Sequence, residues 1–277
     1  MAWPAVAAYA RGDGPQDAER GELREQRWHI PTTDGSGRPM RATVFRPPGG
    51  APAPLVVVNH GSRVSGNATM PVPRFSAAAG WFVRRGCVVA VPLRRGYGET
   101  GGRWNESYGH CENADFHRAG LEAARDIEAA VAYMRAQPFV RTPGTIVVGQ
   151  SAGGWGSLAV ASRNPADIPA IVNFAGGRGG RRGDVANVNC SPDKLVACAA
   201  AYGRTARVPT LWIYTVNDTY FDPGLSRRMA DAYRAAGGNV DYRLLPAFGR
   251  DGHSLFGAAD GVPVWSAHLG PFLDRFR

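Results

Sequence analysis

The sequence predicts an α/β fold built on a mostly parallel, doubly wound sheet, with an antiparallel hairpin on its N-terminal side. Short, continuous apolar runs are typical of strands covered on both faces, and they occur at 55–59, 87–91, 145–148, 170–174 and 210–214. Helical patterns separate these runs, and strands that alternate with helices build a parallel sheet. A chain of 277 residues is long enough to bury the core of one such domain.

In chain order, residues 23–30 and 40–46 are expected to form the hairpin, because the segment between them is rich in turn formers. The clearest helix is expected over 114–137, where apolar residues keep helical spacing. Further helices are expected at 71–85, 152–163, 194–202, 223–236 and 264–276, with a last strand at 240–245. Residues 1–22 are expected to be a mobile N-terminal segment and residues 23–277 a single domain. Within it, the irregular residues 176–203 are the best place for a short lid over a site with little or no other cap.

The net charge is +9, and Lys194 is the only lysine, so arginine carries the excess. The arginines are scattered, and the sequence contains no basic helix and no basic stripe interleaved with aromatic residues. This pattern favours a solvated basic surface and predicts no nucleic-acid partner. No stretch approaches the ~18 consecutive apolar residues that a membrane helix needs, so no membrane partner is expected either.

The four cysteines predict at most a disulfide and no metal site. Cys87 lies in an apolar run and is expected to be a buried small hydrophobe. Cys111, Cys190 and Cys198 lie in loop-like or helix-start surroundings, and the preferred pair is Cys190–Cys198 because it would close a short loop. None has metal-ligand spacing, so no metal or other cofactor is expected. Loop cysteines favour a periplasmic or secreted location over a cytoplasmic one.

Residues 149–153 read Gly-Gln-Ser-Ala-Gly and directly follow an apolar run. In a Gly-x-Ser-x-Gly elbow a strand ends and a helix begins within one strained turn, which exposes the serine hydroxyl above the sheet. The small residues that follow, over 152–161, suit a helix packed tightly on a sheet. Ser151 is therefore the candidate nucleophile, and a glycine-rich turn with an incidental serine is the alternative.

A serine needs a base to take its proton and an acid to orient that base, and after this elbow they follow in the order acid, then histidine. Asp218 follows the strand predicted over 210–214, and His253 lies in the loop after the last predicted strand. Both therefore fall at the carboxyl edge of the sheet, where ligands bind in such folds. Asp222 and Asp251 are alternative acids, although Asp222 is expected to begin a helix and Asp251 is very near His253 in sequence.

The negative charge that develops in acyl transfer is best received by fixed backbone N–H groups. One donor is expected on Ala152, directly after the nucleophile. The other is expected on Ser62, because Gly61 permits a tight turn after the strand predicted over 55–59. His60 is expected to brace this loop through hydrogen bonds and to take no part in the chemistry.

The set formed by His60-Gly61-Ser62, residues 149–153, Asp218 and His253 resembles the α/β-hydrolase fold. Within that fold it resembles the dienelactone hydrolase-like and prolyl-oligopeptidase-like serine hydrolases, over roughly residues 23–276. Residues 94–100, Arg-Arg-Gly-Tyr-Gly-Glu-Thr, are similar to the Arg-Gly-x-Gly loop of those groups. Dienelactone hydrolases use a cysteine nucleophile, whereas this chain has Ser151, so the resemblance implies a general ester or amide hydrolase. At 277 residues, no propeller domain like that of the oligopeptidases is expected.

The resemblance implies a carboxylesterase that forms an acyl-enzyme on Ser151 and acts on small or aromatic esters. A peptidase or amidase with the same triad is the alternative, and a non-catalytic binding protein of the same fold is a third. Arg178 and Arg181 are expected to approach the site from its rim and pair with an anionic group, unless their loop simply faces solvent. Trp155 and Tyr220 are expected to line an aromatic-accepting pocket, unless they belong to the core. The oligomeric state is left open.

Overall fold

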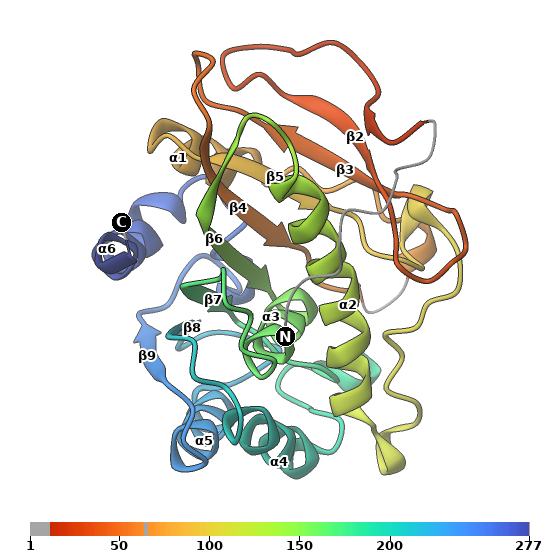
Figure 1. Cartoon of the computed structure of the whole chain (residues 1–277). Helices are drawn as coiled ribbons and strands as arrows, with labels where there is room; N and C mark the ends of the chain where they lie inside the picture. The colour runs from red at the N-terminus through yellow and green to blue at the C-terminus, as the bar shows by residue number, and fades with distance from the viewer. Residues whose placement is uncertain (1–11, 64–65, 277) are drawn as a thin grey trace.

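In the computed structural model, which describes residues 12–63 and 66–276, the chain forms a nine-stranded sheet in the order β1-β2-β3-β5-β4-β6-β7-β8-β9 (Figure 1). Neighbouring strands are parallel throughout the stretch β5-β4-β6-β7-β8-β9. The pairs β1–β2, β2–β3 and β3–β5 are antiparallel. The predicted fold class, a mostly parallel sheet with an antiparallel N-terminal hairpin, is confirmed.

The parallel strands follow the apolar runs of the sequence, and they are β4 (Ala53–Asn59), β5 (Val88–Pro92), β6 (Val140–Gln150), β7 (Ala170–Phe174), β8 (Thr210–Thr215) and β9 (Val240–Leu245). Within β4 the side chains alternate between two cores. Leu55 and Val57 join one core, while Val56 and Val58 join the other. This two-sided burial explains why the runs show no alternation of polar and apolar residues.

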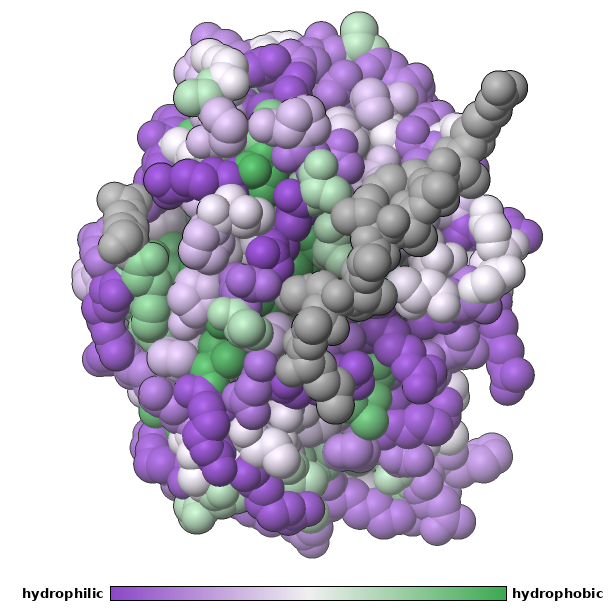
Figure 2. Space-filling model, in the orientation of Figure 1, coloured by the Kyte–Doolittle hydropathy of each residue, from purple (hydrophilic) through white to green (hydrophobic). Residues whose placement is uncertain are grey.

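Helices cover both faces of the sheet. One core includes residues of α2 (Phe116–Arg135), α3 (Ala152–Ala161), α4 (Pro192–Gly203) and α5 (Pro223–Ala235). The other core includes residues of α1 (Ser76–Arg84) and α6 (Val262–Leu273). Asp115 caps α2 by accepting the backbone N–H of Arg118 at 2.9 Å. None of the helices in residues 12–63 and 66–276 is long and apolar enough to cross a membrane. On the face shown in Figure 2, hydrophilic residues predominate and hydrophobic ones form small, separate patches.

The N-terminal part differs from the expectation of a mobile segment over 1–22. Strand β1 (Gly14–Pro15) pairs with β2 (Gln26–Ile30), which pairs with β3 (Met40–Phe45). The backbone of Arg20 also bridges to that of Glu25. Backbone pairing thus joins residues 14–16 to β2 and Arg20 to Glu25, so ordered structure begins before residue 23. Residues 1–11 of the predicted segment lie outside the described residues.

The segment predicted to be a lid over 176–203 divides into two parts. Its second part is α4, which packs against α5 and α2. Its first part is irregular, with one short 3₁₀ turn at Arg182–Asp184. Asn187 and Asn189 tie this part to the loop after β8, through hydrogen bonds to the carbonyl oxygens of Thr219 (2.8 Å) and Tyr220 (2.5 Å). Only residues 176–191 are therefore available for the expected lid, and hydrogen bonds tie this segment to the loop after β8.

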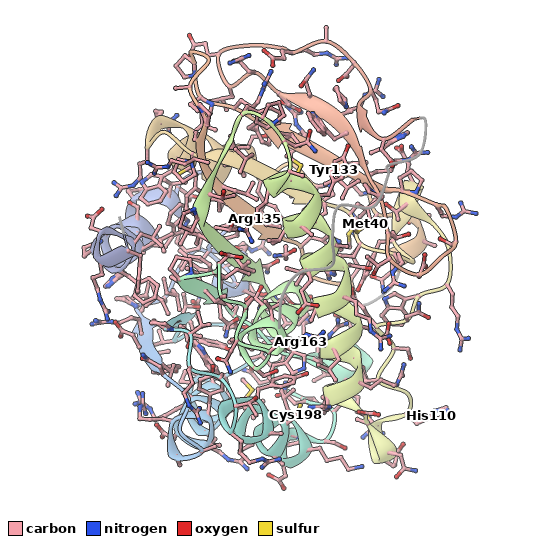
Figure 3. All side chains as sticks on the ribbon, in the orientation of Figure 1. Met40, His110, Tyr133, Arg135, Arg163 and Cys198 are labelled. Atoms are coloured by element: carbon pink, nitrogen blue, oxygen red, sulfur yellow. A yellow bond between two sulfur atoms is a disulfide. The ribbon has the colours of Figure 1, made fainter. Side chains whose placement is uncertain are left out.

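The disulfide joins Cys111 to Cys190, so the preferred pair Cys190–Cys198 was wrong. Cys198 lies on α4, where it is buried and not disulfide-bonded (Figure 3). Because helix α4 turns Cys198 into the core, closeness in sequence does not bring it to Cys190. Cys87 also departs from expectation: β5 begins only at Val88, and Cys87 is half-buried.

Candidate active site

Ser151 occupies a strained turn between β6 and α3. Its φ and ψ are 56° and −121°, in a region that non-glycine residues rarely adopt. Such a conformation costs about 1–3 kcal/mol, so the surrounding structure must hold it in place. A Cβ atom on Gly149 would overlap the backbone of Gly153, and one on Gly153 would overlap the carbonyl oxygens of Asn59 and His60. Both outer positions of the elbow therefore require glycine.

Hydrogen bonds from neighbouring segments hold the strained serine. The N–H of Ser151 donates to the carbonyl oxygen of Phe174 at the end of β7 (2.9 Å). The carbonyl oxygen of Ser151 accepts from Trp155 in α3 (3.0 Å) and from Gly177 after β7 (3.3 Å). The Ser151 residue is 7% exposed, so it is largely buried and does not stand on an open surface.

His253 and Asp218 meet at the carboxyl edge of the sheet, 35 residues apart in sequence. Nδ1 of His253 lies 3.0 Å from Oδ2 and 3.1 Å from Oδ1 of Asp218. The Asp218 side chain is inaccessible to solvent, and its Oδ1 also accepts the N–H groups of Tyr220 (2.8 Å) and Phe221 (3.0 Å). This carboxylate can accept a hydrogen bond from Nδ1–H of His253, and in that tautomer Nε2 is free to accept a proton.

The two alternative acids hold other positions. Asp222 caps α5 by accepting the N–H groups of Gly224 (2.7 Å) and Leu225 (3.1 Å). Asp251 accepts the N–H and hydroxyl of Thr219 and the backbone N–H of His253. Burial alone would raise the pKa of Asp251, but these hydrogen bonds hold it below its ordinary value. Asp251 thus joins the loop of the acid to the loop of the histidine.

The loop after β4 lies directly against the nucleophile. A Cβ atom on Gly61 would stand 2.9 Å from Cβ of Ser151, so this position also requires glycine. Ser62 follows it and is half-buried. Ala152 is the first residue of α3, where a helix leaves its N–H groups without partners inside the helix. The expected oxyanion donors, Ala152 and Ser62, therefore belong to the two segments that meet at Ser151.

His60 is buried within this loop and uses both ring nitrogens. Nε2 accepts the backbone N–H of Arg94 (3.2 Å), and Nδ1 faces the carbonyl oxygen of Gly61 (2.6 Å). The carbonyl oxygen of His60 accepts Nη1 of Arg94 (2.9 Å). Burial, together with the charge of Arg94, lowers the pKa of His60 to about 3, so the ring is neutral and its Nδ1–H donates to Gly61. This geometry fits the expected bracing role.

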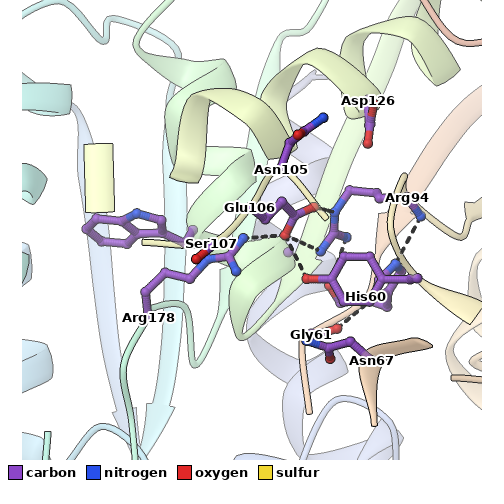
Figure 4. A network of polar contacts seen from close by, with 12 residues as sticks. His60, Gly61, Asn67, Arg94, Asn105, Glu106, Ser107, Asp126 and Arg178 are labelled. Carbon is purple, nitrogen blue, oxygen red and sulfur yellow. Dashed lines mark hydrogen bonds and ion pairs between the residues drawn. The ribbon is translucent and has the colours of Figure 1, made fainter. Parts of the chain in front are cut away.

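Arg178 does not lie at the rim of the site as expected. It is 3% exposed and forms an ion pair with Glu106, which also binds Arg94 (Figure 4). Glu106 stands 72 residues earlier in the chain, in a loop with no periodic pattern, and the sequence offers no signal that joins the two. Sequence reasoning therefore missed Glu106 entirely and mistook the surroundings of Arg178.

Trp155 is likewise a core residue and does not line a pocket. It is fully buried, and its Nε1 donates to the carbonyl oxygen of Phe116 (2.9 Å). Tyr220, in contrast, lies against the candidate base, with its ring centroid 4.1 Å from that of His253 and the planes 23° apart. The guanidinium carbon of Arg181 lies 5.5 Å from the Tyr220 ring centroid, and its Nη1 donates to Thr219 (2.9 Å). Tyr220 and Arg181 thus adjoin the site.

Gln150, the residue before the candidate nucleophile, was also missed. Its side-chain nitrogen donates to the carbonyl oxygen of His253 (3.1 Å), which ties the elbow to the histidine loop. The elbow pattern leaves this position unspecified, so the sequence carries no signal for it. Within residues 12–63 and 66–276, no group of three or more His, Cys, Asp or Glu side chains is placed to hold a metal ion.

Comparison with known proteins agrees with this geometry. Residues 73–176 match the model of the prolyl oligopeptidase family. An acylaminoacyl peptidase from Pyrococcus horikoshii matches 92% of this chain with a TM-score of 0.68 at 17% identity. An esterase from Pyrococcus furiosus matches 95% with a TM-score of 0.66 at 15% identity. The chain has the fold of the α/β hydrolases.

The structural neighbours differ in length and in the activity that their descriptions name. The chain spans 42% of the acylaminoacyl peptidase but 99% of the esterase. A protein from Klebsiella pneumoniae described as a dienelactone hydrolase matches 88% of this chain, over 96% of its own length, with a TM-score of 0.59 at 17% identity. No curated protein matches the sequence. The family model covers less than half of the chain, and esterases and peptidases are both among the structural neighbours.

Proposed function

We propose that this protein cleaves carboxylic esters through an acyl-enzyme on Ser151, with His253 as general base and Asp218 as the acid that orients it. The observation that carries the proposal is the bond from His253 Nδ1 to the fully buried Asp218, on a loop that Gln150, the residue before the strained Ser151, binds through the carbonyl oxygen of His253 (3.1 Å). This combination supplies a base with a fixed tautomer and a nucleophile that the backbone presents to the site.

In the proposed reaction, Nε2 of His253 takes the Ser151 hydroxyl proton as Oγ attacks the ester carbonyl carbon. The carbonyl oxygen becomes an oxyanion, which the N–H groups of Ala152 and Ser62 receive. The intermediate then collapses, the carbon–oxygen bond to the alcohol breaks, and His253 returns its proton to the leaving alcohol. Water, deprotonated by His253, attacks the acyl carbon next; the bond from that carbon to Oγ then breaks, His253 returns the proton to Oγ of Ser151, and the carboxylic acid leaves.

Two observations support an ester as the bond that is cleaved. The chain matches nearly the full length of a compact esterase, whereas it spans less than half of the acylaminoacyl peptidase. Residues 176–191 offer at most a short lid over the proposed site, and a small ester needs no larger enclosure. The proposed substrate is accordingly a small-molecule ester.

A peptidase or amidase is the second candidate, because residues 73–176 match the prolyl oligopeptidase family. Purified protein offered p-nitrophenyl esters and aminoacyl-p-nitroanilides separates the two. We expect the esters to be hydrolysed with a kcat/KM at least about 100-fold higher than that of the anilides. Faster turnover of the anilides would reverse the assignment. If both substrates stayed intact and a fluorophosphonate failed to label the protein, the third possibility, a non-catalytic binding protein, would replace both.

A further inference from the structure

Tyr220 contacts both members of the His253–Asp218 pair. Its backbone N–H donates to Oδ1 of Asp218 (2.8 Å). Its ring is stacked on the His253 imidazole, with the ring centroids 4.1 Å apart and the planes 23° apart. Tyr220 therefore holds the candidate acid through its backbone and faces the candidate base through its side chain.

Residues 176–191 pack against Tyr220 and hold its ring in this place. The carbonyl oxygen of Tyr220 accepts Nδ2 of Asn189 (2.5 Å). The backbone at Gly180 runs so close that a Cβ atom there would stand 3.0 Å from Cβ of Tyr220. The guanidinium carbon of Arg181 lies 5.5 Å from the ring centroid. These contacts restrict rotation of the Tyr220 side chain away from His253.

The charged groups that face His253 are carboxylates. Asp218 lies 3.0 Å from Nδ1 of His253, and Oδ1 of Asp251 accepts the backbone N–H of His253 (3.0 Å). Arg181 brings a positive charge to the neighbourhood, but its Nε binds Oδ1 of Asp184 (3.0 Å). A positive charge on the imidazole would therefore lie next to carboxylates, while the nearby cation has its own carboxylate partner.

Two further side chains reach His253, and both are uncharged. Gln150 donates from the elbow to the carbonyl oxygen of His253 (3.1 Å). The ring of Phe221 lies 5.8 Å from the imidazole and is tilted by 52°. Tyr220 is nearer and closer to parallel, so it presents the face of its ring more directly to the imidazole.

In the proposed reaction His253 takes a proton, and its imidazole becomes a cation. The face of an aromatic ring carries partial negative charge and attracts a cation that lies within about 6 Å of its centroid. The Tyr220 ring meets this condition. Because the attraction is stronger for the charged imidazole than for the neutral one, it stabilises the transition state more than the ground state.

We propose that Tyr220 is a positioning residue of the hydrolysis: its ring holds the imidazole of His253 against Asp218 and stabilises it once it is protonated. The phenol hydroxyl takes no part, so only the ring face is required. This role differs from the lining of an aromatic-accepting pocket, which is the role expected from the sequence. The inference rests on the proposed function, because the imidazole becomes a cation only if His253 acts as the base.

Two substitutions test this role with p-nitrophenyl butyrate as the substrate. Tyr220→Leu removes the aromatic ring but keeps an apolar side chain and the backbone N–H to Asp218. Because the His253 side chain is largely buried, the attraction corresponds to about 5- to 30-fold, and kcat should fall by that factor with KM unchanged. Tyr220→Phe keeps the ring and should keep kcat within about 2-fold of the wild type.

The pH profile distinguishes this role from a loss of packing. A ring that stabilises the protonated imidazole makes the free enzyme hold that proton to higher pH, so without the ring the proton leaves at lower pH. In Tyr220→Leu the acid limb of kcat/KM should therefore move to lower pH by the logarithm of the same factor, about 0.7 to 1.5 pH units. A ring that only fills space would lower kcat and leave the limb in place, and a ring that lines a substrate pocket would raise KM. Either result would overturn the inference.

A ring of similar shape with a different charge distribution isolates the electrostatic part. Pentafluorophenylalanine incorporated at position 220 keeps an aromatic ring but loses its negative face. It should show the lower kcat and the moved acid limb of Tyr220→Leu. If it were as active as Tyr220→Phe, the inference would be wrong, and this comparison decides the matter even where Tyr220→Leu folds poorly.

Tyr242→Leu is the matched control, because Tyr242 is half-buried on β9 and its ring faces Tyr214 at 5.9 Å. It should keep the kcat and pH profile of the wild type. If it reproduced the changes of Tyr220→Leu, general destabilisation would explain both and the inference would fail. Unchanged kinetics of a folded Tyr220→Leu would remove only the role of Tyr220. If the wild type cleaved no p-nitrophenyl ester and a fluorophosphonate did not label Ser151, the proposed function itself would fail.

Discussion

Replacing Asp218 by asparagine should nearly abolish turnover without unfolding the protein. Oδ1 of Asp218 accepts two backbone N–H groups, from Tyr220 (2.8 Å) and Phe221 (3.0 Å). The amide oxygen must keep that place, so the amide nitrogen falls at the position of Oδ2, 3.0 Å from Nδ1 of His253. Because this nitrogen donates, the imidazole must accept at Nδ1 and carry its proton on Nε2, where it cannot act as a base.

The size of the effect follows from the free-energy cost of keeping the His253 proton on Nδ1 opposite the new amide group. Returning the proton to Nδ1 would set two buried donors against each other, and each unsatisfied donor costs about 1–3 kcal/mol. Together they cost about 2–6 kcal/mol, which at about 1.4 kcal/mol per factor of ten lowers kcat roughly 30- to 20,000-fold. Loss of the negative charge beside the imidazolium moves the result toward the larger figure.

The assay is kcat for a p-nitrophenyl ester, with thermal melting as the measure of folding. Asp222→Asn is the matched control, because asparagine caps a helix about as well as aspartate and Asp222 only caps α5. That variant should keep wild-type kcat. Near-full activity of Asp218→Asn would refute the reasoning and move the acid to Asp251 or Asp222.

Three further results are expected. Gly153→Ala should lower the free energy of unfolding by about 2–4 kcal/mol, because its Cβ would overlap the backbone of Asn59, whereas Gly50→Ala has open space and should change it little. Cys111→Ser should lower it by about 4 kcal/mol, since the disulfide closes a loop of 79 residues; an unchanged melting temperature would contradict this. The pKa of His60 falls from 6.5 to about 3 on folding. The free energy of unfolding should therefore decrease by about 1.4 kcal/mol per pH unit as the pH falls between those two values. In urea titrations His60→Gln should lack that slope between pH 6 and 4.5.

Much of the fold is readable from the sequence because burial on both faces of a parallel strand leaves a continuous apolar run. Strands β7 and β9 begin and end where the sequence predicts them. Strand β6 instead begins at Val140, five residues before its apolar run, because Val140 and Arg141 pair with β4 before a register shift. This extension contains polar residues, Pro143 and Gly144, so it shows no apolar run in the sequence. Backbone pairing with β4 makes its first residues part of the strand.

Some residues of the candidate site can likewise be predicted from the sequence, whereas others cannot. The order of elbow, acid and histidine follows the chain direction of the sheet, so Ser151, Asp218 and His253 can be chosen from sequence position alone. Which side chains fill the space behind them depends on contacts between distant loops. Arg178 and Glu106 lie 72 residues apart and Cys111 and Cys190 lie 79 apart, and nothing local in the sequence records such pairings. Trp155 illustrates the same limit, because a pocket tryptophan and a core tryptophan look alike in sequence.

The central claim is that Ser151 is an activated nucleophile, and covalent labelling tests it most directly. The folded protein is incubated with a fluorophosphonate, digested and examined by peptide mass spectrometry, with Ser151→Ala as the control. Phosphonylation of Ser151 in the wild type, and none in Ser151→Ala, is the expected result. An adduct on another serine, or an unmodified Ser151 in a protein that still hydrolyses esters, would contradict it.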